Sequence, residues 1–329
     1  MSTEKTVQCP SFLLDAAAGQ APLRTAIVNA GTPIVMESAR DAANAGILEP
    51  VLFGDRGDIE SCARDLGWDL TGLEVVDAND ESVAASEAAF AAGSGDVGAI
   101  MKGHVHTNTF MRAVLNKEAG LRTGRRLSHL FMMTAPAREE PLFITDAALN
   151  VHPDEETLQV IVANVVSAAR AIGIAQPKIA LLSATEEATE AVPSSMQAAR
   201  LNTWAEDNVD DADVFGPLAF DLAVSPASAA LKAVSHPVAG NADAIVVPDI
   251  VTGNALFKLM VHFLGACAAG VVLGARVPVL LTSRADPPAA RLASAALAAV
   301  FATYEAGRME AEASAGDDVQ KNARPQLKA

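Results

Sequence analysis

Short β-branched segments alternate with longer segments of helical periodicity along most of this 329-residue chain. The run RTAIVNA at 24–30 precedes TPIVMESARDAANAGI at 32–47, whose apolar residues recur three and four positions apart. The alternation continues to AIMKG at 99–103 and a helix from about Thr107. Such a pattern is typical of βα units, which build a mainly parallel sheet with helices on its faces. The chain is therefore predicted to be an α/β protein.

The alternation breaks once, near the middle of the chain. HLFMMTA and PLFITDAA are separated only by PAREE, which is too short for a helical crossover and indicates two strands joined by a tight loop. The length of the chain also favours two lobes over a single core. We expect a first lobe at 1–140, a second lobe at 141–284, a last helix near 285–306 and a frayed polar tail at 307–329.

Composition and charge exclude several classes of protein. Half of the residues are apolar, which is typical of a globular protein. The net charge of -16 argues against binding to nucleic acid or to an anionic membrane, because both require clustered cations. No apolar run of membrane-spanning length is evident. The spacing of Cys9, Cys62 and Cys267 fits neither a disulfide framework nor a metal motif, so a cytoplasmic location is expected.

The sequence GSGDVG matches the glycine pattern of dinucleotide-binding loops at Gly93, Gly95 and Gly98. That pattern must follow a strand and open a helix. In this chain it follows a predicted helix and precedes a predicted strand. A helix end followed by a loop is therefore favoured over a nucleotide site.

The segment KGHVHT lies at the C-terminal end of a predicted strand, at the edge where ligands bind in α/β sheets. Lys102 and the backbone amides after it could meet an anion. His104 and His106 raise the alternative of a metal site, although no cysteine or carboxylate pattern accompanies them.

Three arginines, Arg122, Arg125 and Arg126, lie within five residues just before a predicted strand. In so acidic a chain they create a local positive field. The alternative is a solvated basic turn with weak surface ion pairs.

A Ser-Arg pair leaves the last predicted strand in VPVLLTSRADPPAARLAS. The hydroxyl of Ser283 and the guanidinium of Arg284 suit a tetrahedral oxyanion such as phosphate. If this pair and the arginine cluster belong to opposite lobes, they would enclose an anion in a cleft between them.

Several blocks in collinear order resemble the phosphate acetyl/butyryltransferase family, and the resemblance covers about residues 20–305. The blocks are IMKGHVHTNTFMRAVLNKEAGLRTGRRLSH, PLFITDAALNV, VFGPLAFDLAVSPASAALK, VAGNADAIVVPDIVTGNALFK and AAGVVLGARVPVLLTSRAD. The sequences GPLAFDLAVS and LTSRAD resemble most closely the phosphate butyryltransferase branch and the acyltransferase part of enoyl-CoA hydratase fusions.

The resemblance implies a two-lobe fold like that of isocitrate and isopropylmalate dehydrogenases, with mainly parallel sheets, an active-site cleft between the lobes and the last helix completing the first lobe. It implies reversible transfer of a short acyl group, acetyl or butyryl, between coenzyme A and inorganic phosphate. Acyl-CoA, inorganic phosphate and acyl phosphate would then be the partners, with coenzyme A as a substrate, no permanently bound cofactor and no metal. Homo-oligomers are also implied.

The same resemblance assigns roles to individual residues. Ser283 and Arg284 match the catalytic Ser-Arg pair of the family. The acetyltransferase branch has an aspartate six or seven residues after that serine, where this chain has Ala289 and Ala290. Asp286 is the nearest substitute as thiol base, and capping of the following helix is its alternative role. Residues expected to bind phosphate or coenzyme A are Lys102, Arg125, Arg126, Ser128, Gly253 and Asn254.

Three questions stay open from the sequence. Asp146 and Asp221 could line the cleft or be structural carboxylates. A dehydrogenase on the related fold is one alternative function, and a non-catalytic protein that binds acyl-CoA or phosphate is another. The length of the acyl chain cannot be inferred.

Overall fold

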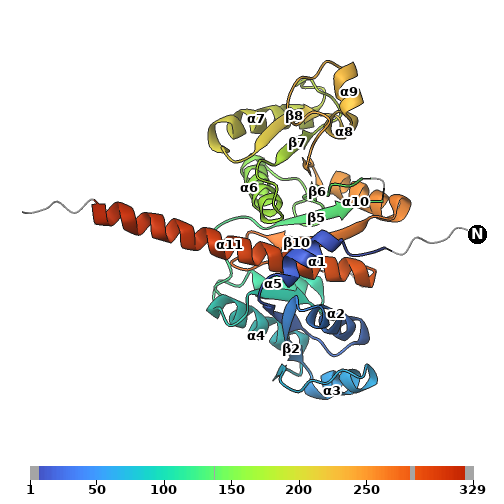
Figure 1. Cartoon of the computed structure of the whole chain (residues 1–329), viewed down its shortest axis with the longest axis vertical. Coiled ribbons are helices and arrows are strands. Elements are labelled where there is room, and N and C mark those ends of the chain that lie inside the picture. The colour runs from blue at the N-terminus through green and yellow to red at the C-terminus, as the bar shows by residue number, and fades with distance from the viewer. Residues whose placement is uncertain (1–6, 137, 282–285, 323–329) are drawn as a thin grey trace, which may run out of the picture.

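The computed structural model of the chain describes residues 7–136, 138–281 and 286–322. Within these residues, one sheet of eleven strands runs through the molecule in the order β3-β2-β1-β4-β11-β10-β5-β6-β9-β7-β8. Helices cover both of its faces (Figure 1). The predicted α/β class is confirmed.

The strands are β1 (Leu23–Val28), β2 (Leu48–Gly54), β3 (Glu74–Asp77), β4 (Ala99–Lys102), β5 (Ser128–Thr134), β6 (Leu142–Thr145), β7 (Lys178–Leu182), β8 (Asp213–Leu218), β9 (Ala244–Val246), β10 (Cys267–Leu273) and β11 (Val279–Leu280). The helices are α1 (Ser11–Ala18), α2 (Pro33–Asn44), α3 (Arg56–Asp65), α4 (Glu81–Ser94), α5 (Thr107–Val114), α6 (Glu155–Ala171), α7 (Pro193–Asn208), α8 (Phe220–Val224), α9 (Pro226–Leu231), α10 (Ile250–Leu264) and α11 (Pro288–Asn322).

Two parallel halves of the sheet are joined by antiparallel strands. One half contains β1 to β4 and β11, and the other contains β6 to β9. Between them β5 pairs antiparallel with β10 and with β6, as the short connection between β5 and β6 predicts. Because β11 pairs with β4, the segment from β10 to β11 completes the sheet beside the first lobe and not within the second.

Strand direction defines the two edges of this sheet. We call the edge where β1, β4 and β11 end the first carboxyl edge. Because β10 and β6 run in the opposite direction, they end at the other edge, where β4 and β11 begin. The loop that enters β5 also lies at this second edge, which we call the first amino edge.

The long helix α11 lies across the middle of the molecule, between the two halves (Figure 1). Its alanine-rich first half is buried, with Ala293, Ala296 and Leu297 fully covered. Small side chains let this helix approach β10, α1, α2 and α6 closely. The core on this face of the sheet is continuous between the lobes, from Ile27 to Val162.

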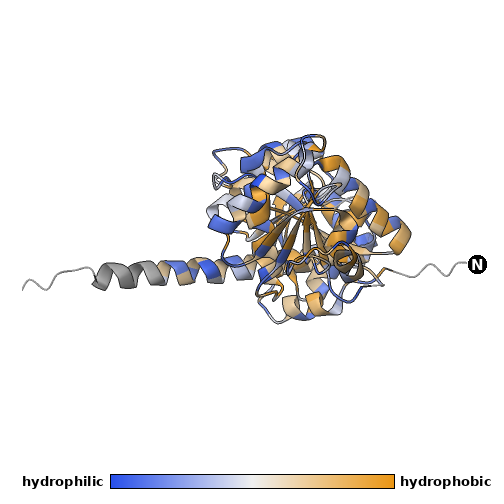
Figure 2. Cartoon of the chain, turned by 90° about the horizontal axis from the view of Figure 1, so that it is seen from above, coloured by the Kyte–Doolittle hydropathy of each residue, from blue (hydrophilic) through white to orange (hydrophobic). Residues whose placement is uncertain are grey.

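The tail predicted at 307–329 is corrected, because α11 continues as a helix to Asn322. Figure 2 shows this part of α11 extending beyond the body of the molecule. Residues 308–313 are all Arg, Met, Glu or Ala, which are strong helix formers. Arg308 also pairs with Glu305 at 2.7 Å and with Glu312, at the spacings that stabilise an exposed helix.

The glycine pattern GSGDVG forms the end of α4. Gly95 has a φ of 91° and terminates the helix in the left-handed conformation. Gly93 lies inside α4, where a Cβ atom would come within 1.5 Å of the carbonyl oxygen of Ala119. The predicted helix end is confirmed. None of the described helices has the length and apolar character needed to cross a bilayer.

Candidate functional site

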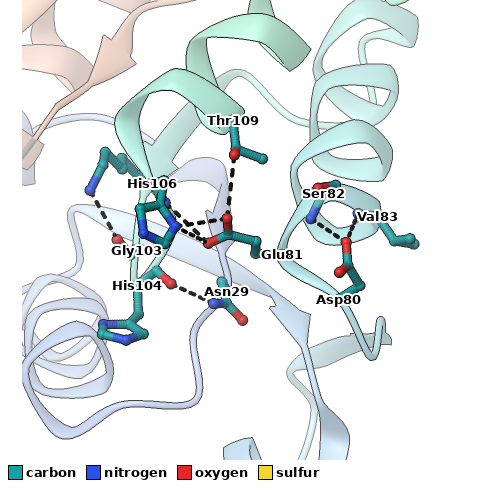
Figure 3. Close-up of polar contacts among 10 residues, drawn as sticks. Asn29, Asp80, Glu81, Ser82, Val83, Gly103, His104, His106 and Thr109 are labelled. Carbon is teal, nitrogen blue, oxygen red and sulfur yellow. Dashed lines mark hydrogen bonds and ion pairs between the residues drawn. The ribbon is translucent and has the colours of Figure 1, made fainter.

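The segment after β4 is fixed against the end of β1 at the first carboxyl edge. A Cβ atom on Gly103 would lie 2.1 Å from the carbonyl oxygen of Val28, so only glycine fits this close approach. The amide of His104 donates to the carbonyl of Asn29 at 3.1 Å, and the Asn29 side chain donates back to the His104 carbonyl (Figure 3). This paired contact holds the chain between β4 and α5.

His106 contacts a carboxylate at the start of α5. Its backbone amide donates to Glu81 Oε2 at 3.1 Å, and its Nδ1 lies 2.8 Å from Glu81 Oε1 (Figure 3). The hydroxyl of Thr109 donates to the same carboxylate at 3.3 Å. The hydrogen bond from the His106 side chain is the main cause that lowers the pKa of Glu81. Glu81 therefore joins α4 to the first turn of α5.

Substituting Glu81 with glutamine should reduce stability at neutral pH, and the difference from the natural protein should shrink in acid. Because folding lowers the pKa of Glu81 from 4.5, the ionised carboxylate contributes stability above pH 4.5 that is lost as the pH falls through the folded-state pKa. Denaturant unfolding at neutral pH and at about pH 3 measures both differences. An equal difference at the two pH values would contradict this role.

The histidines at this edge raised the alternative of a metal site. Among the residues that the structure describes, no group of three or more His, Cys, Asp or Glu side chains is placed to hold a metal ion. The Nδ1 contact of His106 with Glu81 instead supports a structural role for that side chain.

Strand β11 ends at the same edge, three residues before Ser283 in the sequence. It lies parallel to β4 with Leu280 beside Met101, one residue before Lys102. Lys102 Nζ lies 3.4 Å from the carbonyl oxygen of Gly103, to which it donates. Ser283 and Arg284 lie outside the described residues. The chain thus leaves β11 beside the segment that carries Lys102.

Arg291 is a buried residue of α11 that the sequence reasoning missed. Its Nε donates to Ser38 Oγ of α2 at 2.6 Å, and its Nη1 donates to the backbone carbonyl of Asp286. These bonds tie the start of α11 to α2 and to Asp286, which lies three residues after Ser283 in the sequence. Its signal in the sequence was its isolation, since it is the sole charged residue between Pro287 and Tyr304.

The arginine loop, residues 122–127, lies at the first amino edge. Arg122 forms a β-bridge with Ala275, and Thr123 Oγ1 donates to the carbonyl of Gly274 at 2.6 Å. The guanidinium groups of Arg122, Arg125 and Arg126 are exposed, and none donates a hydrogen bond to another residue in the described part of the chain. Among the described residues no carboxylate forms a salt bridge with these three groups, although Arg126 is close enough to Asp154 to contribute to the lowering of its pKa.

Cavities surround this loop. Arg122 and Arg125 line a hollow of about 850 Å³ beside α11. Both also line two smaller cavities of about 460 Å³ and 440 Å³, together with Arg126. The 440 Å³ cavity is also lined by Leu115, just after α5, and by Asn150, after β6. An anion in this cavity would meet at least two guanidinium groups.

The expectation that the arginine cluster and the Ser-Arg pair enclose one anion stays a prediction, because Ser283 and Arg284 lie outside the described residues. Because β5 and β11 run in the same direction, the loop that enters β5 and the last residue of β11 lie at opposite edges of the sheet. Helix α5 connects the two regions. It begins after His106, and its eight residues extend for about 12 Å towards the 440 Å³ cavity.

Ser128, predicted to bind phosphate or coenzyme A, is buried at the start of β5. Its hydroxyl accepts a hydrogen bond from Asn164 Nδ2 of α6 at 2.8 Å. The adjacent His129 is also buried, and burial lowers its pKa to about 4 while Asp146 opposes that effect more weakly. The His129 ring is therefore neutral at physiological pH. The hydroxyl of Ser128 has a packing role, and ligand binding by it stays a prediction.

Gly253 and Asn254 support the turn after β6. The start of α10 is capped by Asp249, whose side chain accepts from the Thr252 amide at 2.9 Å. A Cβ atom on Gly253 would lie 2.7 Å from the carbonyl oxygen of Asp146, and Asn254 Nδ2 donates to the Ala147 carbonyl at 3.4 Å. These contacts account for both residues structurally, and their predicted binding of phosphate or coenzyme A stays a prediction.

The three cysteines are packing residues. Cys62 and Cys267 are buried, Cys9 is partly buried and all three are free thiols. Burial raises the pKa of the Cys9 thiol to about 11 and that of Cys267 to about 12. Neither of these two forms a reactive thiolate at neutral pH.

Comparison with known sequences identifies related proteins. A family model described as Phosphate acetyl/butaryl transferase matches residues 82–299. A phosphate acetyltransferase from Rhizobium meliloti is 41% identical over 291 residues, which cover 88% of this chain and 92% of that protein. A phosphate butyryltransferase from Clostridium acetobutylicum is 38% identical over 280 residues, which cover 85% of this chain and 93% of that protein.

Solved structures extend the comparison. A branched-chain phosphotransacylase from Enterococcus faecalis V583 is similar with a TM-score of 0.76 and 32% identity, covering 85% of this chain and 99% of that one. A 4-hydroxythreonine-4-phosphate dehydrogenase from Klebsiella pneumoniae is similar with a TM-score of 0.53 at 12% identity, covering 85% of this chain and 99% of that one. The second likeness concerns the fold alone. The expected dehydrogenase-like two-lobe fold is confirmed.

Proposed function

Because the chain belongs to the phosphate acetyl/butyryltransferase family, we infer that it transfers a short acyl group reversibly between coenzyme A and inorganic phosphate. The observation that carries this conclusion is the identity of 38% or more with curated acetyl- and butyryltransferases over most of both chains. The protein is an acyltransferase. Coenzyme A is then a substrate and not a resident cofactor.

The reaction requires stabilisation of one tetrahedral centre. A phosphate oxygen attacks the thioester carbonyl, a C–O bond forms and the carbonyl oxygen takes up negative charge. The C–S bond then breaks, and the thiolate of coenzyme A leaves and takes up a proton. In reverse, the thiol must lose its proton before attack, because its ordinary pKa is near 8.5. Positioned cations and hydroxyl donors stabilise the charge in both directions.

We place the reacting groups at the first carboxyl edge. Ser283 would donate to the carbonyl or phosphate oxygen, Arg284 would hold phosphate and Lys102 would add a second cation. The pairing of β11 with β4 supports this proposal, because it brings the chain that precedes Ser283 beside Lys102. The metal-free chemistry of oxyanion stabilisation suits these three side chains.

Asp286 is our candidate for the base that accepts the thiol proton. The family position six or seven residues after the serine holds Ala289 and Ala290 here. Neither alanine carries a carboxylate, and Ala290 is buried in the first turn of α11. Asp286 lies two residues after Arg284 in the sequence and is the first residue described after it. Its backbone carbonyl accepts a hydrogen bond from Arg291.

The arginine loop is proposed to bind the phosphate groups of coenzyme A. Coenzyme A is an elongated molecule that carries its thiol at one end and its phosphates at the other. Helix α5 leads from the first carboxyl edge to the cavity lined by Arg125 and Arg126. Both guanidinium groups are exposed and make no hydrogen bond to another described side chain. The thiol of coenzyme A would therefore lie at the first carboxyl edge while its phosphates lie at the arginine loop.

Replacing both Arg125 and Arg126 with alanine should raise the KM for acyl-CoA by about tenfold or more, because charge-assisted hydrogen bonds to phosphate are lost. The KM for the matching acyl-pantetheine, which lacks the anionic nucleotide, should change little. Steady-state kinetics with both substrates measures the difference. Parallel increases for the two substrates would contradict phosphate recognition by this loop.

The activity itself is tested by phosphate-dependent release of coenzyme A from acetyl-, propionyl- and butyryl-CoA. Turnover that requires phosphate is the expected result, and the series would define acyl length. Tight binding of acyl-CoA without turnover would favour the non-catalytic alternative. Reduction of NAD with a hydroxyacid, without release of coenzyme A, would favour a dehydrogenase.

A homo-oligomer is a further part of the proposal. Helix α10 exposes large apolar side chains on its outer side, including Leu259, Leu264 and Phe263, whose exposed fraction is 83%. Contiguous exposed apolar residues of this kind are typical of protein interfaces. We also propose that the protein acts in the cytoplasm, where its substrates acyl-CoA and phosphate are available.

A further inference from the structure

The carboxylate of Asp146 is fully engaged in organising the turn after β6. It is buried, with an exposed fraction of 1%. It accepts hydrogen bonds from the backbone amides of Ala148 at 2.8 Å and Leu149 at 2.9 Å. The amide of Asn150 donates to it at 3.3 Å and the Asn150 side chain at 2.6 Å. Because a carboxylate offers about four acceptor positions, this group has no capacity left for a substrate.

The same turn is bonded to the last residue of the arginine loop and to the start of β5. Asp146 Oδ2 accepts from the amide of His129 at 3.1 Å. Asn150 Nδ2, which carries two hydrogens, donates to Asp146 and also to the carbonyl of Leu127 at 2.8 Å. Leu127 and His129 lie one and three residues after Arg126. The turn therefore fixes the chain immediately beyond the last guanidinium group.

The other side of the arginine loop is fixed by the end of β10. Thr123 donates to the Gly274 carbonyl, and the amide of Arg276 donates to the carbonyl of Leu121 at 2.9 Å. A Cβ atom on Gly274 would lie 2.3 Å from the carbonyl oxygen of Arg126, so backbone packs directly on backbone there. Asp146 and Asn150, from the second lobe, hold the other end of the loop through their hydrogen bonds to His129 and Leu127.

Asn150 also faces the cavity that the arginines line. The 440 Å³ cavity is formed by Arg125, Arg126, Leu149 and Asn150, among other residues. We propose that Asp146 and Asn150 are positioning residues, which hold the arginine loop in the geometry that binds the anionic end of coenzyme A. This inference rests on the proposed function of the loop. The two residues act through Arg125 and Arg126 and do not touch the reacting atoms.

The test uses Asn150→Ala, because loss of the Asp146 carboxylate could prevent folding. The dissociation constant for coenzyme A, measured by calorimetry, should rise by about tenfold, while that for pantetheine should not change. Turnover with acyl-pantetheine should also be retained. Asn208→Ala, which removes an exposed amide from α7, is the matched control and should leave both constants unchanged.

A double-mutant cycle separates positioning from a general structural role. In the background of the double variant Arg125→Ala and Arg126→Ala, Asn150→Ala should add no further loss of affinity, because it acts through the absent guanidinium groups. Additive losses, or equal weakening for pantetheine, would overturn the inference. If the arginine substitutions alone leave the affinity for coenzyme A unchanged, the proposed function of the loop fails. If they weaken it and Asn150→Ala does not, the positioning role fails.

Discussion

Arg284→Ala is expected to lower the rate of phosphate-dependent release of coenzyme A by at least about a hundredfold. This is the size of loss seen when one preorganised partner of a developing oxyanion is removed. Arg284 is the residue of the Ser-Arg pair that would hold phosphate, and it follows the strand that lies beside β4. Turnover at saturating acyl-CoA and phosphate measures the effect.

Two control variants sharpen this experiment. Arg284→Lys keeps the charge but removes the planar fork of donors, so it should recover only part of the rate. Arg64→Ala removes an exposed arginine from the last turn of α3, which packs beside β2 and β3, and should retain full activity. A turnover number for Arg284→Ala within twofold of the natural value would remove Arg284 from the proposed mechanism.

Gly103→Ala is expected to destabilise the protein by about 3 kcal/mol and to reduce activity together with stability. The new Cβ atom would lie 2.1 Å from the carbonyl oxygen of Val28 and 2.9 Å from that of Asn29. Both obstacles are backbone atoms at the ends of paired strands, so neither can rotate away. Relief of the clash must move the segment from Lys102 to His104, which lies at the proposed reaction centre.

The matched control is Gly307→Ala in the exposed part of α11. No atom lies within 4 Å of a Cβ atom at Gly307, so the same substitution meets open space there. It should stabilise the protein by about 0.5–1 kcal/mol, because alanine has the higher helix propensity. Denaturant unfolding of both variants tests the prediction. If Gly103→Ala left the free energy of unfolding unchanged, the backbone between β4 and β1 would be able to move apart without cost, which would contradict the prediction.

Much of the candidate site follows from local patterns in the sequence. The positions of Lys102 at the end of a strand and of the Ser-Arg pair after the last strand were predicted from strand runs alone, and β4 and β11 confirm the strands. A helix end within GSGDVG was predicted, and it falls at Gly95, which adopts a positive φ without a steric cost. The contacts of Arg291 and Asn150 were not predictable, since their partners lie up to 253 residues away.

The sequence by itself determined the alternation of strands and helices, the acidic surface and the family, because hydrophobic period, charge and motif order are properties of the linear chain. Tertiary structure alone decided which motifs meet. The antiparallel insertion of β10 between β11 and β5 sends the arginine loop and the end of β11 to opposite edges of one sheet. Strand direction depends on pairings between distant segments, and no local pattern records it.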